Sequence, residues 1–259
     1  MNTSLRRNGL AVVASLLAAA GCEKAEPQLD LDTIVARHTE ARGGAAALEA
    51  VSALEVRRRV EERKQQFTTH YIATRDGRMR LDVYDDDRRV FSAGNDGESA
   101  WQQAGSLAEA EEMPEWALTA VRRALRHNLY ALHEQVASGT RLELKEREKT
   151  AGLLHWVIDA TDPDGYRQRL HIHPYSYLIS RIQEFAPVNP ERTTVATDLD
   201  TYYLEFQTVD GVLFSFKSET RSSDSGEPVQ VTEALEIKVN PELDESVFAR
   251  PSDDEGDRR

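Results

Sequence analysis

The chain of 259 residues is poor in cysteine and lacks the short motifs that mark catalytic sites. Its one cysteine, Cys22, cannot form an intramolecular disulfide and leaves no thiol for nucleophilic chemistry in the folded body. The sequence also contains no Gly-rich phosphate loop, no Gly-x-Ser-x-Gly elbow and no His-Glu-x-x-His motif. We therefore expect a non-enzymatic protein without a cofactor, and an envelope hydrolase is the least favoured function class.

Basic side chains are scarce as well: 32 lysines and arginines face 45 aspartates and glutamates, which gives a formal net charge of −13. Binding to nucleic acid needs a basic surface, so nucleic acid is not expected as a partner. An anionic membrane surface would also repel this body, so association with a membrane requires an anchor. The acidic runs at 85–87 and 109–112 are interpreted as solvated faces.

Long apolar runs are missing except for Gly9 to Ala20, which is too short to span a bilayer in a mature protein. Arg6 and Arg7 precede this run, and it ends in Leu-Ala-Ala-Ala-Gly-Cys at Cys22. The ending resembles the lipobox of bacterial lipoproteins, in which small residues precede a cysteine that is diacylated and becomes the new N-terminus. We expect a signal peptide at 1–21 and a stable lipid anchor on Cys22.

The match to the lipobox is imperfect, because Ala19 stands where leucine is preferred. Residue 23 is glutamate and not the aspartate that resembles an inner-membrane retention signal, which favours the outer membrane and the periplasmic side of the envelope. The alternative is an ordinary secreted protein with a stray cysteine. A free thiol is prone to oxidation in an oxidising compartment, whereas an acylated cysteine has no free thiol, so lipidation is favoured over this alternative.

The mature chain begins with a polar tether at 22–28 and an amphipathic helical stripe that stops at Gly43-Gly44. A short helical piece follows at 45–51, and a second long helix is predicted from Pro114 to about Gln135. Elsewhere apolar residues recur with period two. Strands are expected at 52–61, 67–75, 79–84, 89–92, 98–103, 141–149, 153–160, 166–173, 177–185, 201–208, 212–220 and 229–239.

These 11 to 12 strands, joined by turn signals, predict a mainly β (α+β) fold with one antiparallel sheet covered by helices. No linker rich in Pro, Gly or Ser divides the chain, so a single domain is expected at 29–250, followed by a disordered acidic tail at 251–259. Arg58 falls on the apolar face of its strand. A buried charge is costly unless it is paired, so Arg58 lies either near a rim or at a polar feature inside a cavity.

Three histidines form the clearest polar group. Pairing the strands so that Trp156 faces Leu170 sets His155 opposite His171, with His173 diagonal on the same face. The same register sets Leu154 opposite Ile172 and Asp159 opposite Arg167. Three imidazoles on one face are candidate ligands of Zn²⁺ or Cu²⁺, and exposed surface histidines are the alternative.

Four stretches in order resemble the outer-membrane lipoprotein-sorting proteins, a LolA/LolB-like family: Ile34 to Gly44, His173 to Arg181, Val209 to Phe214 and Val239 to Phe248. Together they span nearly the whole mature chain. The resemblance implies a strongly curved antiparallel sheet that half-closes around a hydrophobic cavity, with helices acting as a lid.

Aromatic side chains are the candidate walls of that cavity, although core packing is their default role. Nine aromatic residues on strand or helix faces are candidates, including Trp116 and Phe216. We expect an acyl-chain pocket formed by Phe67, Tyr71, Trp101, Trp156, Tyr202, Phe206 and Phe214.

The sequence therefore favours a membrane-anchored periplasmic lipoprotein that binds a lipid, or the acyl chains of another lipoprotein, in a half-barrel. Anchoring makes a diffusing carrier less favoured than a receptor, sensor or local chaperone. The alternative is a protein-interaction subunit of an envelope complex that has no ligand cavity and docks another protein through its sheet surface or edge strand.

Overall fold

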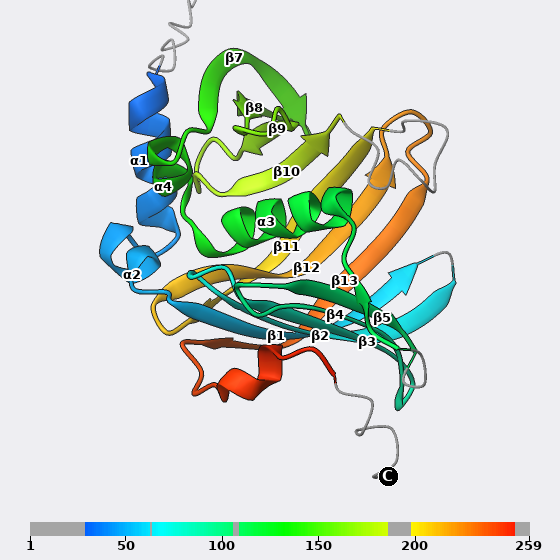
Figure 1. Cartoon of the computed structure of the whole chain (residues 1–259). Coiled ribbons are helices and arrows are strands. Elements are labelled where there is room, and N and C mark those ends of the chain that lie inside the picture. Colours follow the sequence, from blue (N-terminus) through cyan, green and yellow to red (C-terminus); the bar gives the residue numbers. More distant parts are fainter. Residues whose placement is uncertain (1–28, 63, 106–108, 186–197, 252–259) are drawn as a thin grey trace, which may run out of the picture.

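The computed structural model describes residues 29–62, 64–105, 109–185 and 198–251 (Figure 1). The expected signal peptide, Cys22, the tether and residues 252–259 of the expected tail lie outside these residues. Within the described part of the chain, thirteen strands form one antiparallel sheet that does not close, in the order β6-β5-β4-β3-β2-β1-β13-β12-β11-β10-β9-β8-β7. The expectation of a curved antiparallel half-barrel is confirmed.

The strands are β1 (Ala53–Glu62), β2 (Gln65–Thr74), β3 (Met79–Asp85), β4 (Arg88–Asn95), β5 (Ala100–Ala104), β6 (Glu111–Glu112), β7 (Arg141–Thr150), β8 (Leu153–Thr161), β9 (Arg167–Ile172), β10 (Ile179–Glu184), β11 (Leu199–Val209), β12 (Val212–Ser222) and β13 (Pro228–Val239). Two meanders, β1 to β6 and β7 to β13, meet where β1 pairs with β13. This pairing joins the two ends of the domain at the middle of the sheet.

The twelve strand ranges predicted from the sequence match twelve of the thirteen strands, and the structure adds one. The additional strand is β6, which pairs with β5 through Trp101 and Glu112 and lies within the acidic run that was interpreted as solvated. Both residues of β6 are exposed, so that interpretation of their side chains agrees with the structure. A strand of two residues is too short to show a period in the sequence.

The helices are α1 (Leu31–Ala41), α2 (Ala45–Glu49), α3 (Glu115–Leu129), α4 (Leu132–Ala137) and the 3-10 helix η1 (Glu245–Phe248). Helix α3 lies inside the curve of the sheet, and α1 and α4 stand side by side at one end of it (Figure 1). Helix α1 begins where the Asp30 carboxylate accepts from the Thr33 amide at 2.8 Å. The helices therefore cover the concave face, as expected for a lid.

The predicted helix from Pro114 to Gln135 is wrong in one respect, because the chain turns at Tyr130 and forms two helices. Tyr130 is extended, with φ −107° and ψ 133°. The carboxylate of Glu134 then accepts from the Ala131 amide at 2.8 Å and caps the start of α4. No Gly or Pro marks this break, so the sequence pattern runs through it.

The outer face of the sheet is covered by the C-terminal segment. Trp101 is fully buried there and its indole N–H donates to the Phe248 carbonyl at 3.2 Å. Gly94, which pairs with Trp101, lies so close to the indole that a Cβ at this position would be 2.5 Å from its ring. The absence of a side chain at Gly94 is therefore what allows Trp101 to lie flat against the sheet.

Candidate ligand-binding site

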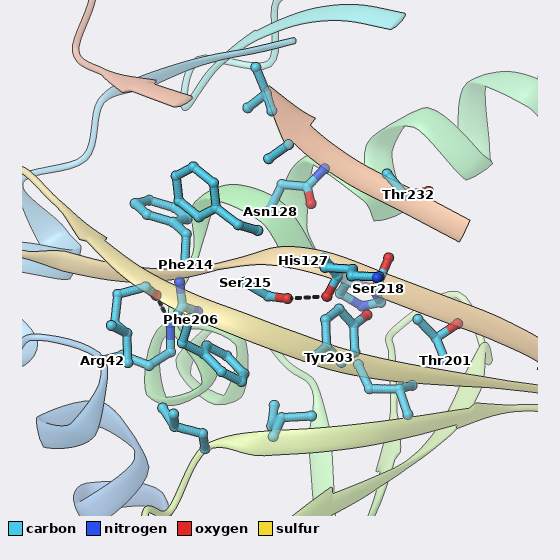
Figure 2. Close-up of a pocket in the computed structure, with 18 of the residues that line it drawn as sticks. Arg42, His127, Asn128, Thr201, Tyr203, Phe206, Phe214, Ser215, Ser218 and Thr232 are labelled. Atoms are coloured by element: carbon cyan, nitrogen blue, oxygen red, sulfur yellow. Dashed lines mark hydrogen bonds between the residues drawn. The ribbon is translucent and has the colours of Figure 1, made fainter. Parts of the chain in front are cut away.

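A cavity of about 320 Å³ opens between the concave face of the sheet and helices α1, α3 and α4 (Figure 2). This volume lies in the range of small-molecule sites, roughly 300–1,000 Å³. The apolar side chains around it come from both meanders and both core clusters, and they are Leu54, Val56, Leu132, Ala160, Leu170, Leu178, Ile179, Ile182, Phe206, Leu213, Phe214, Phe216, Ala234 and Ile237. The sheet thus encloses a space that its own side chains do not fill.

Strand alternation explains which residues reach the cavity. On β1 the residues Leu54, Val56 and Arg58 share one face, and all three line the cavity. The partner strand β13 has an irregularity here, since Arg57 pairs with Glu236 while Arg58 pairs with Ala234. The bulge leaves both Leu235, which is 47% exposed, and Glu236 outside the cavity, while Ala234 and Ile237 line it.

Strand β11 changes face within its length. Tyr203 and Phe206 both line the cavity, although residues an odd number apart on a regular strand point to opposite faces. Glu205 lies between them with φ +52°, in the left-handed region, and it interrupts the alternation. The aromatic wall in Figure 2 therefore depends on this irregular position.

The structure places only some of the expected aromatic residues at the cavity. Tyr71, Phe206 and Phe214 line the cavity, as expected. Phe216 also lines it, although it is not among the seven residues predicted to form the pocket. The other expected residues are not among the lining residues. Trp101 lies on the outer face, and Trp156 packs in the core cluster beneath α1 and α4. Tyr202 lies 6.0 Å from the Arg181 guanidinium, on the outer side of β11.

Phe67 is on the same face of β2 as Tyr71 but beyond the described cavity. Tyr203 was missed by sequence reasoning in favour of its neighbour Tyr202. Nothing in the run Thr-Tyr-Tyr-Leu-Glu-Phe separates the two, because both tyrosines suit a half-buried strand.

Charged and polar groups also reach the cavity. Arg58 lines it, which decides between the two expected placements in favour of the cavity. Burial lowers the pKa of Arg58 and of Arg42 from α1, yet an arginine stays charged at neutral pH. Burial raises the pKa of Tyr71 and of Tyr203, so both hydroxyls stay protonated and can donate hydrogen bonds.

His38 lines the cavity from α1 and is 3% exposed. Burial, followed by the charge of Arg42, lowers the pKa of His38 to about 4. Its ring is therefore neutral at pH 7, and Nδ1–H donates to the Tyr177 carbonyl at 2.8 Å. This bond ties α1 to the turn before β10.

The histidine prediction is wrong in its register. Trp156 pairs with Ile172 and Val157 with His171, so His155 is displaced by two residues from its expected partner. A shift of two keeps every side chain on its face, so the apolar pattern cannot detect it. By the same shift, Leu154 does not pair with Ile172, and Asp159 faces Arg169 in place of Arg167, with a 2.7 Å ion pair.

The alternative prediction, that these histidines are exposed on the surface, is also wrong for His155 and His171. His155 and His171 are 2% and 0% exposed. His155 meets the ring of His173 edge-on at 5.4 Å, while His171 Nδ1 lies 3.3 Å from the Thr150 hydroxyl. Within the described ranges, no group of three or more His, Cys, Asp or Glu side chains is placed to hold a metal ion.

The fold is similar to that of solved structures from the lipoprotein-sorting group. A LolA superfamily protein from Nitrosomonas europaea is 11% identical, with a TM-score of 0.56, and the match covers 86% of this chain and 98% of that one. A domain assigned to outer membrane lipoprotein sorting, from Vibrio parahaemolyticus, is 11% identical, with a TM-score of 0.53, over 83% and 94% of the two chains. The chain therefore has a LolA-like fold.

No protein-family model matches the sequence, and no curated protein matches it. Among the helices of the described residues, none combines the length and the apolar character that crossing a membrane requires.

Proposed function

We propose that this protein is a membrane-anchored periplasmic lipoprotein that binds a hydrophobic ligand, a lipid or the acyl chains of another lipoprotein, without catalysing a reaction. The observation that carries the proposal is the cavity of about 320 Å³ on the concave face, lined mainly by apolar side chains. Apolar burial is worth about 25 cal/mol per Å², so an acyl chain placed against this wall would be held by the hydrophobic effect.

Several lining residues keep accessible surface although they belong to the interior of the fold. Phe206, Phe214, Phe216, Ile179 and Ile182 are half-buried and all line the cavity. Apolar surface left uncovered in this way favours an occupant. The LolA-like fold supports the same proposal, because it places a lid of helices over a concave sheet.

Anchoring is the second part of the proposal. Cys22 would hold the protein at the outer membrane through its acyl chains, facing the periplasm, and the polar residues up to Leu29 would form the connection to α1. Two acyl chains give a stable anchor. An anchored protein cannot diffuse between two membranes, so we propose a receptor, sensor or local chaperone for the ligand and not a shuttle.

Native mass spectrometry of the detergent-extracted full-length protein tests both parts at once, because it gives the mass of the N-terminal modification and of any retained ligand. We expect an acylated N-terminus and a co-purifying lipid. Delipidated protein that retains no lipid and does not bind a fluorescent fatty acid would contradict ligand binding.

A pair of variants connects binding to the cavity. Ala234 lines the cavity on β13, and Leu235 beside it is exposed on the outer face. Ala234→Phe should fill part of the cavity and weaken binding of the fluorescent fatty acid, whereas Leu235→Phe should leave binding unchanged. Equal effects of the two substitutions would show that the ligand does not bind on the concave face.

The alternative, a protein-interaction subunit of an envelope complex, requires a filled core and an apolar patch on the outside. The unfilled cavity favours the ligand-binding proposal over it. If the delipidated protein bound no lipid but captured a defined envelope protein through its edge strand β7, the alternative would replace it.

A further inference from the structure

The guanidinium of Arg58 has an unusual position for a charged group. It lines the cavity from the middle of β1, where the side chain is partly exposed, and burial lowers its pKa. Within the described part of the chain, it forms no ion pair and no hydrogen bond, and its guanidinium carbon lies 5.5 Å from the centre of the Tyr71 ring. A partly buried cation that has no acceptor in the protein loses hydration without compensation, so a partner is expected from outside the fold.

The charges around the cavity differ in sign from those of the whole protein. The chain carries a formal net charge of −13, yet the charged residues lining the cavity include three cations, Arg42, Arg58 and Lys217, and one carboxylate, Glu184. Glu184 accepts a hydrogen bond from the Tyr166 hydroxyl. Carboxylates, which are abundant elsewhere in the chain, are thus nearly absent from the lining of the cavity. The resulting positive charge favours an anionic ligand in the cavity.

Hydrogen-bond donors surround Arg58. The hydroxyls of Tyr71 and Tyr203 stay protonated because burial raises their pKa values. Asn128 from α3 lies near Tyr71, with 3.4 Å between its Nδ2 and the tyrosine oxygen. A guanidinium with phenol and amide donors around it is suited to a carboxylate or a phosphate.

Arg42 is a weaker candidate for the same role. Its Nε donates to the Leu213 carbonyl at 3.4 Å, and its guanidinium carbon lies 5.9 Å from the centre of the Phe214 ring. Arg42 therefore already has a protein acceptor and an aromatic neighbour, whereas Arg58 has no acceptor among the described residues.

We propose that the cavity binds an anionic amphiphile, with its carboxylate or phosphate on the Arg58 guanidinium and its acyl chain against the phenylalanines of β11 and β12. This inference rests on the proposed function and narrows it, since a neutral lipid or a purely apolar chain would leave the positive charge of Arg58 without a counter-ion.

The test uses the delipidated full-length protein and the neutral dye Nile red, which reports occupancy of the cavity without an ionic preference. Palmitate and palmitoyl lysophosphatidate are the anionic competitors, and hexadecanol and monopalmitoylglycerol are the neutral ones, all at pH 8. We expect one or both anions to displace the dye at concentrations about tenfold lower than their neutral counterparts. The difference between palmitate and the lysophosphatidate identifies the headgroup.

Arg58→Met should remove this preference while keeping the dye bound. Arg57→Met is the matched control, because Arg57 is the preceding residue of β1, is exposed on the outer face and changes the net charge equally. Arg58→Met should also unfold at the same or a higher temperature than the wild type, because it removes an unpaired, partly buried charge. Arg58→Gln provides a second variant of similar shape.

The outcomes separate the two proposals. If wild-type protein binds Nile red and releases it equally to neutral and anionic competitors, the anionic ligand is excluded and the hydrophobic cavity remains. The same conclusion follows if the preference survives in Arg58→Met. If wild-type protein binds neither dye nor competitor, the proposed function itself fails.

Discussion

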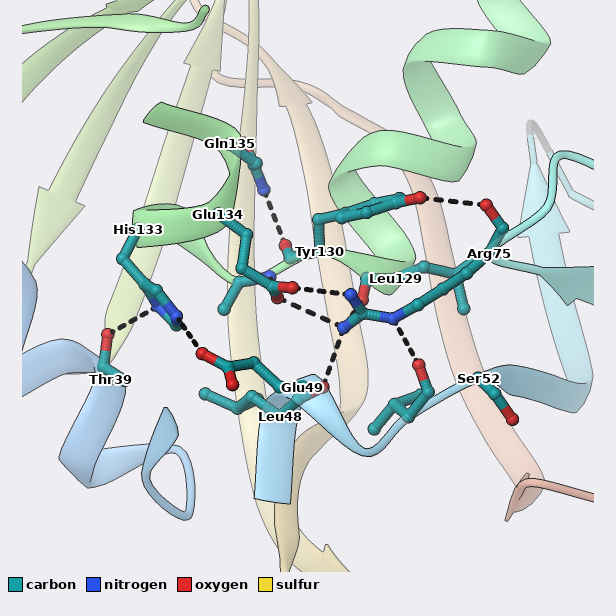
Figure 3. Close-up of polar contacts among 12 residues, drawn as sticks. Thr39, Leu48, Glu49, Ser52, Arg75, Leu129, Tyr130, His133, Glu134 and Gln135 are labelled. Carbon is teal, nitrogen blue, oxygen red and sulfur yellow. Dashed lines mark hydrogen bonds and ion pairs between the residues drawn. The ribbon is translucent and has the colours of Figure 1, made fainter. Parts of the chain in front are cut away.

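The guanidinium of Arg75 holds both carboxylate oxygens of Glu134, with Nη1 to Oε1 at 2.5 Å and Nη2 to Oε2 at 3.1 Å (Figure 3). The same guanidinium donates to the Leu48 carbonyl at 2.8 Å and to the Leu129 carbonyl at 3.0 Å. One side chain at the end of β2 thus joins the ends of α2 and α3 to the start of α4 by donating to a carbonyl in the last turn of each of the two helices.

Arg75→Met is expected to destabilise the protein by about 3 kcal/mol, because the Glu134 carboxylate loses its cationic partner and the Leu48 and Leu129 carbonyls each lose a charged donor. Arg75→Lys should recover only part of the lost stability, since an ammonium group cannot form the bidentate contact that the guanidinium makes with the Glu134 carboxylate. Urea unfolding followed by circular dichroism measures both.

Arg59→Met is the control for Arg75. Arg59 pairs with Glu233 at 3.0 Å, but both side chains are nearly half exposed. The expected loss is below about 1 kcal/mol, as for other surface ion pairs. Similar losses for Arg59→Met and Arg75→Met would contradict the role assigned to Arg75.

The fold could be predicted from the sequence because its main signal is local. Alternation along β1, for example, places Leu54, Val56 and Val60 on one face whatever their partners are. The resemblance to the lipoprotein-sorting family added the curvature, which alternation does not encode.

The site was less predictable, because it depends on small irregularities. The left-handed conformation of Glu205 moves Phe206 to the cavity side, and the break at Tyr130 places Glu134 against Arg75. Neither position is a glycine or a proline. Arg58 was visible as a charge on an apolar face, but only the surrounding strands show that it faces a cavity and not a rim.

The buried ring of His38 links stability to pH. Its pKa of about 4 lies below the ordinary value of about 6.5, so between these pH values the unfolded chain binds a proton that the folded chain does not. His38 therefore does not reduce stability well above pH 6.5, and the protein loses stability through this residue as the pH falls from 6.5 towards 4. The loss attached to His38 is about 3 kcal/mol.

His38→Asn keeps an amide N–H for the Tyr177 carbonyl and removes the titrating ring. Between pH 4 and 6.5, we expect the free energy of unfolding of His38→Asn to fall less steeply with decreasing pH than that of the wild type. The difference in slope should correspond to about one proton fewer taken up on unfolding. In Arg42→Met, an NMR titration should show a higher pKa for His38, because a neighbouring positive charge is gone. An unchanged pH profile in His38→Asn would mean that His38 is not buried in its neutral form.

Close packing of Gly94 on Trp101 gives a prediction for the outer face. Gly94→Ala would place a methyl group 2.5 Å from the indole ring, and Trp101 is fixed by its bond to the Phe248 carbonyl. The expected loss is about 2 kcal/mol. In a Trp101→Phe background the same substitution should cost less, and a double-mutant cycle of unfolding free energies measures the difference. Strictly additive losses would show that the two residues do not clash.

Cys22 carries the prediction about the anchor. Cys22→Ser removes the thiol that would be acylated, so the protein is expected either in the soluble periplasmic fraction or as an unprocessed precursor. Ala19→Leu, which brings the sequence before Cys22 closer to the lipobox, should stay with the membrane and serves as the control. Fractionation and intact mass measure both variants. If Cys22→Ser is processed and sediments with the membrane as the wild type does, membrane attachment does not depend on acylation of Cys22, and the proposed anchor is wrong.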